Sequence, residues 1–192
     1  MLHHIYSDYY KQPAKITEKK PEIHGVVLHD DAENNKAVDY IQWLQRRIDK
    51  DELEKGWGCV YVDKESCYWF HPSNYIEWHC GEPFANAHFI GIERCQSLIN
   101  GVLSDKAFME NEETSYWIAA LLLKKYNLPI TRETVRLHKE FSDTACPARA
   151  WQVHLGDVPT NEKNINKLKD YFIEHIKRYS DQITKDDLDV LG

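Results

Sequence analysis

The chain has 192 residues, of which 42% are hydrophobic and 12% aromatic, and it carries a formal net charge of −7. This length and apolar content favour one globular domain with a substantial core. The acidic balance argues against nucleic acid as the main partner, because phosphate binding needs clustered Lys and Arg. The longest apolar run, Trp117–Leu123, is far shorter than the roughly 20 residues that span a bilayer, so we expect no membrane partner.

The N-terminal segment has neither a basic head nor a hydrophobic signal core, which predicts a protein made and folded in a cytosol. The cysteines form an odd set without a C-x-x-C pair, so a disulfide framework is not expected. They are Cys59, Cys67, Cys80, Cys95 and Cys146.

The first half of the chain predicts mostly strands. Residues 1–22 are polar, contain two prolines and predict an irregular arm, and a strand is expected over 23–29. Apolar residues at helical spacing then predict an amphipathic helix over about 36–54. Segments rich in Cys, Val, Tyr, Trp and Phe predict a strand meander, followed by another strand over 88–94. The meander segments are 59–62, 67–71 and 75–79.

The second half predicts two longer helices, over 112–126 and 161–178, with an extended segment at 135–138 between them. Strands interleaved with helices indicate a mixed α/β fold. We expect a single domain over residues 1–178, in which helices flank a central sheet of about five to six strands. Residues 179–192 are acidic and lack a dense apolar pattern, which predicts a linker or disordered tail.

The segment from His138 to Cys146 carries the clearest chemical signal. An imidazole and a thiol eight positions apart bracket a polar loop, and Pro147 fixes the backbone just after the sulfur. Zn²⁺ takes nitrogen and sulfur ligands, and a catalytic site uses three of them and keeps one position open. The best candidate for the third ligand is His29, which ends an apolar run and is followed by two aspartates. For each residue alone, a surface or core histidine and an inert buried thiol are the simpler interpretations.

Four blocks of the sequence, in order, resemble the type-2 N-acetylmuramoyl-L-alanine amidases, the family of phage endolysins, bacterial autolysins and peptidoglycan recognition proteins. The first is Val27-Leu28-His29-Asp30, which resembles the first zinc motif. The second, Glu77–Gly81, resembles the Trp-His-x-Gly strand end of the family. The third, Asn86–Glu93, resembles its Asn-x-x-x-Ile-Gly-Ile-Glu segment, and His138 through Cys146-Pro147 resembles its closing motif. The resemblance covers about residues 23–178 and implies the fold of the peptidoglycan recognition proteins.

The resemblance implies a Zn²⁺ ion held by His29, His138 and Cys146, with water or a substrate carbonyl in the fourth position. Zinc lowers the pKa of bound water to about 7 and polarises an amide carbonyl. Glu93 stands where the amidase-active branches keep a carboxylate, which implies a general base that later acts as an acid. A surface ion pair is the structural alternative for this residue.

Two departures from the family concern the oxyanion. Many relatives use a tyrosine at the start of the second strand, where this chain has the stretch Trp57–Tyr61, so Tyr61 or His79 is the expected substitute. Some relatives use Lys two residues before the last ligand, where this chain has Thr144, whose hydroxyl donates a neutral hydrogen bond. The combination of Glu93 with Thr144 fits the glutamate-using branches. The substrate groove is expected along Trp57, Tyr61, Trp78 and His79.

The implied activity is hydrolysis of the amide bond between N-acetylmuramic acid and the L-alanine of the stem peptide, with bacterial peptidoglycan as partner. The predicted lack of a signal peptide favours a phage endolysin that is made in the host cytoplasm and acts on the cell wall after release. We expect a monomer or weak dimer, with the acidic segment leading toward an absent wall-binding module.

Two rival functions remain at this stage. One is a non-catalytic peptidoglycan-binding module on the same fold, against which the intact ligand trio argues. The other is a thiol hydrolase in which Cys146 is the nucleophile and His138 the base.

Overall fold

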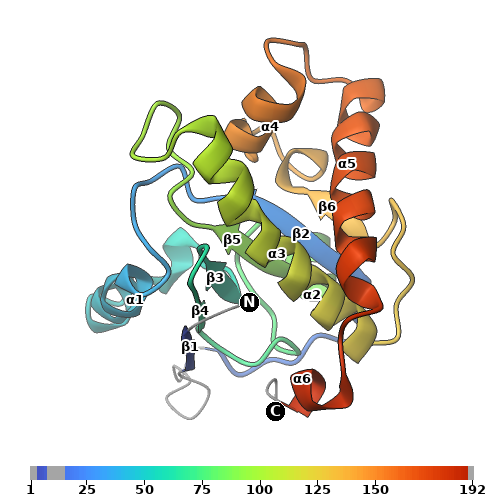
Figure 1. Cartoon of the computed structure of the whole chain (residues 1–192). Helices are drawn as coiled ribbons and strands as arrows, with labels where there is room; N and C mark the ends of the chain where they lie inside the picture. Colours follow the sequence, from blue (N-terminus) through green and yellow to red (C-terminus); the bar gives the residue numbers. More distant parts are fainter. Residues whose placement is uncertain (1–3, 8–15, 190–192) are drawn as a thin grey trace.

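The computed structural model describes residues 4–7 and 16–189. A six-stranded sheet forms the centre, in the order β1-β4-β3-β5-β2-β6 (Figure 1). Every neighbouring pair is parallel except β3 with β4, which form an antiparallel hairpin. The strands are β1 (His4–Ser7), β2 (Gly25–Asp30), β3 (Val60–Val62), β4 (Ser66–Trp69), β5 (Phe89–Arg94) and β6 (Val135–Leu137).

Helices cover both faces of this sheet. The longest two, α3 and α5, lie side by side across one face (Figure 1). Helix α1 packs on the opposite face of β3 and β4, where Tyr40 and Leu44 join a cluster with Tyr61 and Tyr68. The helices are α1 (Asp39–Asp49), α2 (Pro83–His88), α3 (Asp105–Lys125), α4 (Ala148–Leu155), α5 (Glu162–Ser180) and α6 (Lys185–Asp189), with 3-10 turns η2 (Leu53–Lys55) and η3 (His138–Glu140).

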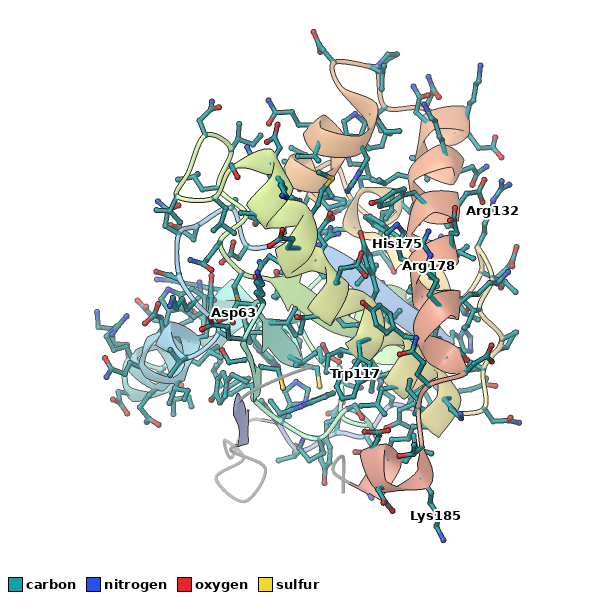
Figure 2. The ribbon with its side chains drawn as sticks, viewed as in Figure 1. Asp63, Trp117, Arg132, His175, Arg178 and Lys185 are labelled. Atoms are coloured by element: carbon teal, nitrogen blue, oxygen red, sulfur yellow. The ribbon has the colours of Figure 1, made fainter. Side chains whose placement is uncertain are left out.

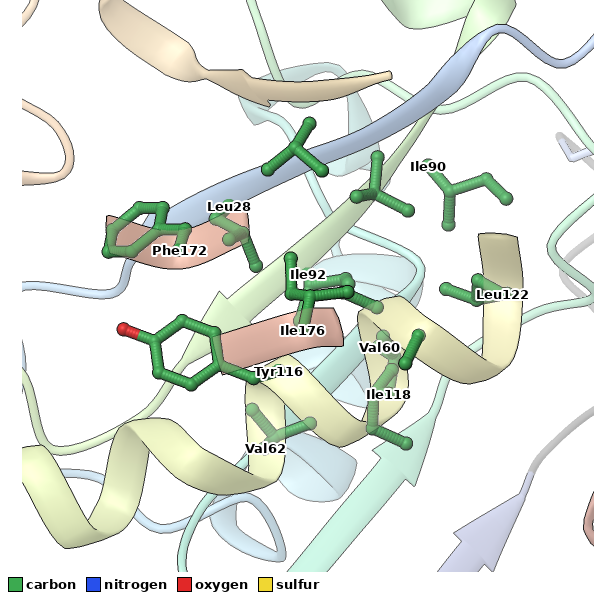
Figure 3. Close-up of a cluster of buried hydrophobic side chains, with 14 of the residues drawn as sticks. Leu28, Val60, Val62, Ile90, Ile92, Tyr116, Ile118, Leu122, Phe172 and Ile176 are labelled. Atoms are coloured by element: carbon green, nitrogen blue, oxygen red, sulfur yellow. The ribbon is translucent and has the colours of Figure 1, made fainter. Parts of the chain in front are cut away.

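The main core fills the space between the sheet and the pair α3 and α5. Leu28 of β2 and Ile90 and Ile92 of β5 meet Tyr116 of α3 and Phe172 of α5 there (Figure 3). Because side chains alternate between the faces of a strand, the other residues of β2 and β5 point to the opposite face. The polar residues that directly follow Leu28 and Ile92 therefore point toward the groove described below.

Polar contacts tie the layers together. His175 of α5 hydrogen-bonds through Nδ1 to the Glu113 carboxylate of α3 at 2.7 Å, between the two helices (Figure 2). Asp63, in the β3–β4 turn, accepts hydrogen bonds from Ser66 N and Oγ and from Ala37 N just before α1. None of the helices within the described ranges is long and apolar enough to cross a membrane.

The mixed α/β fold with a sheet of about five to six strands is confirmed, and several details differ. Residues 75–79 form no strand, because their backbone groups bond to separate segments: Ile76 N donates to Glu18 O, and Glu77 N donates to Asn86 O. The predicted N-terminal arm contributes β1, while residues 1–3 and 8–15 lie outside the described part of the chain. Helices α2 and α4 were not expected, because each is short.

The segment after residue 178, predicted to be a linker or disordered tail, contains helical structure up to Asp189, and its role as a linker remains a prediction. Helix α5 continues to Ser180, and Ile183 is buried at 4% exposure in the main core. The Lys124 ammonium of α3 donates to the backbone oxygens of Ser180 (3.2 Å) and Ile183 (2.7 Å). One apolar side chain thus anchors an otherwise acidic segment, which average composition does not reveal. Residues 190–192 lie outside the described ranges.

Candidate metal centre and groove

The three predicted metal ligands meet at one edge of the sheet. His29 lies near the end of β2, His138 directly follows the adjacent β6, and Cys146 lies in the loop before α4. Their ligand atoms all lie within 4.8 Å of one another. Parallel neighbouring strands bring their carboxyl ends to the same edge, which explains how residues 109 positions apart in sequence, 29 and 138, converge.

The donor set fits Zn²⁺. The Cys146 Sγ atom lies 3.7 Å from His29 Nδ1, and tetrahedral Zn–S and Zn–N bonds of ordinary length place such atoms roughly 3.5 Å apart. The backbone N–H of Asp30 donates to Sγ at 3.3 Å, which favours a thiolate there. Burial lowers the pKa of His29 well below its ordinary value, so its ring is neutral and one of its nitrogens can give a lone pair to a metal.

Glu93 lies beside this trio. It pairs in register with His29 across β2 and β5 and with Tyr61 across β3 and β5. Its Oε1 is 3.9 Å from His29 Nδ1, and its side chain is 16% exposed. Burial, then the charges of Asp31 and Asp30, raise the pKa of the Glu93 carboxyl to about 8. A carboxylate of this kind at the groove surface can exchange a proton near neutral pH.

A cavity of about 350 Å³ opens over these residues. All four residues predicted for the substrate groove line it, together with the three predicted ligands and Glu93. Trp57 and Trp78 are stacked at 5.7 Å with an interplanar angle of 17°, and Trp78 is 49% exposed. Tyr61 is buried at 3% exposure, and its hydroxyl accepts a hydrogen bond from Gly58 N. Their roles in substrate binding remain predictions.

Two predicted site residues have neighbours that the sequence did not suggest. The Thr144 hydroxyl accepts a hydrogen bond from Cys146 N at 3.2 Å, and this bond stabilises the loop that carries Cys146. Thr144 is not among the residues that line the cavity, and its oxyanion role remains a prediction. His79 is buried at 7% exposure, and its Nδ1 lies 2.8 Å from His29 Nε2.

A buried ionic network behind the ligands was missed by sequence reasoning. The guanidinium of the fully buried Arg94 donates to the backbone oxygen of His29 at 3.1 Å. It also lies 2.9 Å from the Asp30 carboxylate and 2.8 Å from that of Glu112. Asp30 in turn accepts from Ala150 N at the start of α4, which ties β2 to the helix after Cys146. The sequence sign that could have revealed the network is the arginine at the end of the apolar strand 89–94.

The groove also has charged walls that were not predicted. Asp31 and Glu33 line one part, and Arg47 and Lys55 line another. The Arg47 guanidinium lies 3.8 Å from the centre of the Trp43 ring and donates to the backbone oxygen of Gly56. The Asp-Asp run after the first strand was the only sequence sign of the acidic part. A molecule bound in this groove therefore meets acidic side chains near the three proposed metal ligands and basic side chains farther along, on α1 and η2.

Comparison with known proteins gives a consistent result. The sequence profile of the N-acetylmuramoyl-L-alanine amidase family matches residues 19–149. Endolysin 2638A of Staphylococcus phage 2638A is 48% identical over 181 residues, which cover 94% of this chain and 37% of that protein. Endolysin PlyTW of Staphylococcus phage Twort is 36% identical over 159 residues, which cover 81% of this chain and 33% of that protein. The chain thus spans about a third of the length of these relatives.

Among solved structures, the PlyG catalytic domain superposes with a TM-score of 0.66 at 20% identity, covering 92% of this chain and 94% of that one. This similarity concerns the fold alone.

Proposed function

The chain belongs to the N-acetylmuramoyl-L-alanine amidase family, and from this premise we propose that it hydrolyses the amide bond between N-acetylmuramic acid and the L-alanine of the stem peptide in bacterial peptidoglycan, with Zn²⁺ as cofactor. The observation that carries the proposal is the meeting of His29, His138 and Cys146 within 4.8 Å beside the Glu93 carboxylate. We propose these three residues as the zinc ligands.

When bound, Zn²⁺ supplies a Lewis acid that acidifies water and polarises the amide carbonyl. Glu93 accepts a proton from the attacking water and donates it to the amine of L-alanine as the C–N bond breaks. Hydroxide is thus added to the carbonyl carbon and the proton to the leaving nitrogen, which yields a carboxylic acid and a free amine. Tyr61 and Thr144 are the proposed hydroxyl donors to the oxyanion, and the ring of Trp78 offers an exposed surface for the glycan.

Within the cell we propose a phage endolysin, which is made in the host cytoplasm and degrades the cell wall after release. The names of the Staphylococcus phage relatives support this proposal. The thiol hydrolase is less well supported, because no hydrogen bond joins Cys146 Sγ to the His138 ring among the contacts of the described residues, where Sγ instead lies near His29 Nδ1 and the backbone of Asp30.

Digestion of purified peptidoglycan with mass analysis of the products tests the activity. We expect free stem peptides that begin with L-alanine, whereas new reducing sugars would identify a glycosidase and contradict the proposal. Lysis is expected to stop with a chelator and to return with Zn²⁺. Activity of metal-free protein that is abolished by alkylation of Cys146 would favour the thiol hydrolase instead.

A further inference from the structure

Parts of two of the sequence blocks singled out above, Trp78-His79-Cys80 of the second and Asn86 through Gly91 of the third, supply no ligand and no proton-transfer group to the proposed reaction. They do lie together against the back of the metal centre. We propose that His79 is a positioning residue for His29: it accepts the Nε2–H proton of that ring and so turns Nδ1 toward the metal. This inference rests on the proposed zinc function.

The geometry of the His29 ring gives its two nitrogens different surroundings. Nε2 lies 2.8 Å from His79 Nδ1. Nδ1, on the other side, lies 3.7 Å from Cys146 Sγ and 3.9 Å from Glu93 Oε1. A hydrogen bond between two imidazole nitrogens holds one proton. If His29 Nδ1 gives its lone pair to a metal, that proton belongs to His29 Nε2, and His79 Nδ1 is the acceptor.

The surroundings of His79 hold its ring in this position. The Asn86 side-chain oxygen accepts from the backbone N–H groups of His79 (3.0 Å) and Cys80 (2.9 Å). The Cys80 thiol also lies 3.3 Å from His79 Nδ1. The amide oxygen of Asn86 therefore fixes the backbone that carries His79, which accounts for an asparagine seven positions after it.

Gly91 provides the space for the ring. A Cβ atom on Gly91 would lie 2.9 Å from both His79 Nδ1 and Glu77 Oε2, which is closer than real Cβ contacts, and 3.0 Å from His79 Cγ. A larger residue at this position of β5 would therefore displace the His79 ring or the Glu77 carboxylate. Asn86 and Gly91 thus position His79. The ring of His79 in turn orients His29, the first proposed zinc ligand.

Partners of this kind fix the tautomer of a ligating histidine and raise its basicity, and their loss commonly weakens metal binding about 10- to 100-fold. Two substitutions separate the acceptor from the bulk of the side chain. His79→Leu keeps a similar volume without an acceptor, and His79→Asn keeps an acceptor oxygen near the position of Nδ1. His88→Leu is the matched control, because His88 lies on α2, where its Nδ1 bonds to Phe84 O.

The measurement is the zinc dissociation constant, by competition with a chromophoric chelator, for the wild type and the three variants. We expect about 10- to 100-fold weaker binding for His79→Leu, a smaller loss for His79→Asn, and no change for His88→Leu. Equal affinity in the wild type and a folded His79→Leu variant would overturn the role of His79 and leave the zinc site intact. A wild type that binds no zinc would overturn both.

Nitrogen-15 NMR of the histidine rings in the zinc-loaded wild type decides the matter if His79→Leu does not fold. We expect His29 to carry its proton on Nε2 and His79 to have an unprotonated Nδ1. A proton on His29 Nδ1 would overturn the inference. A merely structural role of His79 predicts no particular tautomer.

Discussion

A groove-lining cluster and a sealed cluster in this fold both gather histidine, cysteine and glutamate side chains. The sealed cluster consists of Cys59, His71 and Glu77, whose possible ligand atoms lie within 4.8 Å of one another and which are fully buried. The Glu77 carboxylate lies 2.7 Å from the Lys20 ammonium, and both side chains have no exposed area. A divalent cation there would lie beside a buried positive charge.

The groove-lining cluster, made of His29, His138, Cys146 and Glu93, faces a cavity of about 350 Å³. The nearest buried cation, Arg94, is on the far side of the strand and binds the backbone oxygen of His29 and two carboxylates. Donor types are therefore a poor criterion for a metal centre. Access from solvent distinguishes the two clusters, and so does the buried Lys20 ammonium, which pairs directly with a carboxylate of the sealed cluster.

The largest expected effect comes from removing one cysteine from each cluster. Cys146→Ala should lose bound zinc and reduce peptidoglycan hydrolysis by more than about 10⁴-fold, since both Lewis-acid stabilisation and water activation are lost. Cys59→Ala should keep one zinc per chain and lose only stability, by about 1–2 kcal/mol for a small buried side chain. Metal analysis measures the zinc content of both variants, and the amount of stem peptide set free from peptidoglycan measures their hydrolysis. Loss of zinc in Cys59→Ala would instead assign the metal to the sealed cluster.

Glu93→Gln separates proton transfer from metal binding within the groove-lining cluster. We expect the zinc content to stay the same and kcat to fall about 10²- to 10⁴-fold, because the amide cannot accept the proton of water. Zinc analysis and initial rates on the same preparation are the measurements. Wild-type rates in the zinc-loaded variant would remove Glu93 from the mechanism.

Lys20→Met tests the sealed cluster. Loss of the ammonium leaves the Glu77 carboxylate buried without its ion partner, which should lower the free energy of unfolding by about 3–5 kcal/mol. Urea denaturation measures this, and the zinc content should not change. The double variant Lys20→Met/Glu77→Gln should recover part of the loss, because the uncompensated charge is then gone. If the loss of unfolding free energy in the double variant equals the sum of the losses in the two single variants, Lys20 and Glu77 are not coupled.

Sequence reasoning reached the groove-lining cluster but not its support. His29, His138, Cys146 and Glu93 were accessible because their motifs have fixed order and because parallel strands bring their ends to one edge. The sealed cluster was not, since Lys20 comes from an irregular segment and meets Glu77 only through tertiary packing.

The same distinction applies to the secondary structure. The strands around 25–30 and 89–94 and the helix at 162–180 followed from apolar periodicity. Residues 75–79 have the composition of a strand, but the backbone of this segment bonds to the 16–24 arm and to α2, and one glutamate points into the interior. Propensity describes a residue and its neighbours in sequence, whereas this segment is determined by partners up to 58 positions away, as in the hydrogen bond from Ile76 N to Glu18 O.

The smallest expected effect is a pH dependence from the sealed cluster. Burial, followed by the charge of Lys20, lowers the pKa of His71 to about 3. Between about pH 3 and 6.5 the unfolded chain therefore binds one proton more at this position, and stability should fall as the pH is lowered through that window. From pH 7 to pH 5 this one group should cost about 2 kcal/mol. Urea denaturation with chelator present, comparing wild type with His71→Leu at both pH values, measures the difference. Equal losses in the two proteins would mean that His71 takes up no extra proton on unfolding and is not kept neutral by its burial in the sealed cluster.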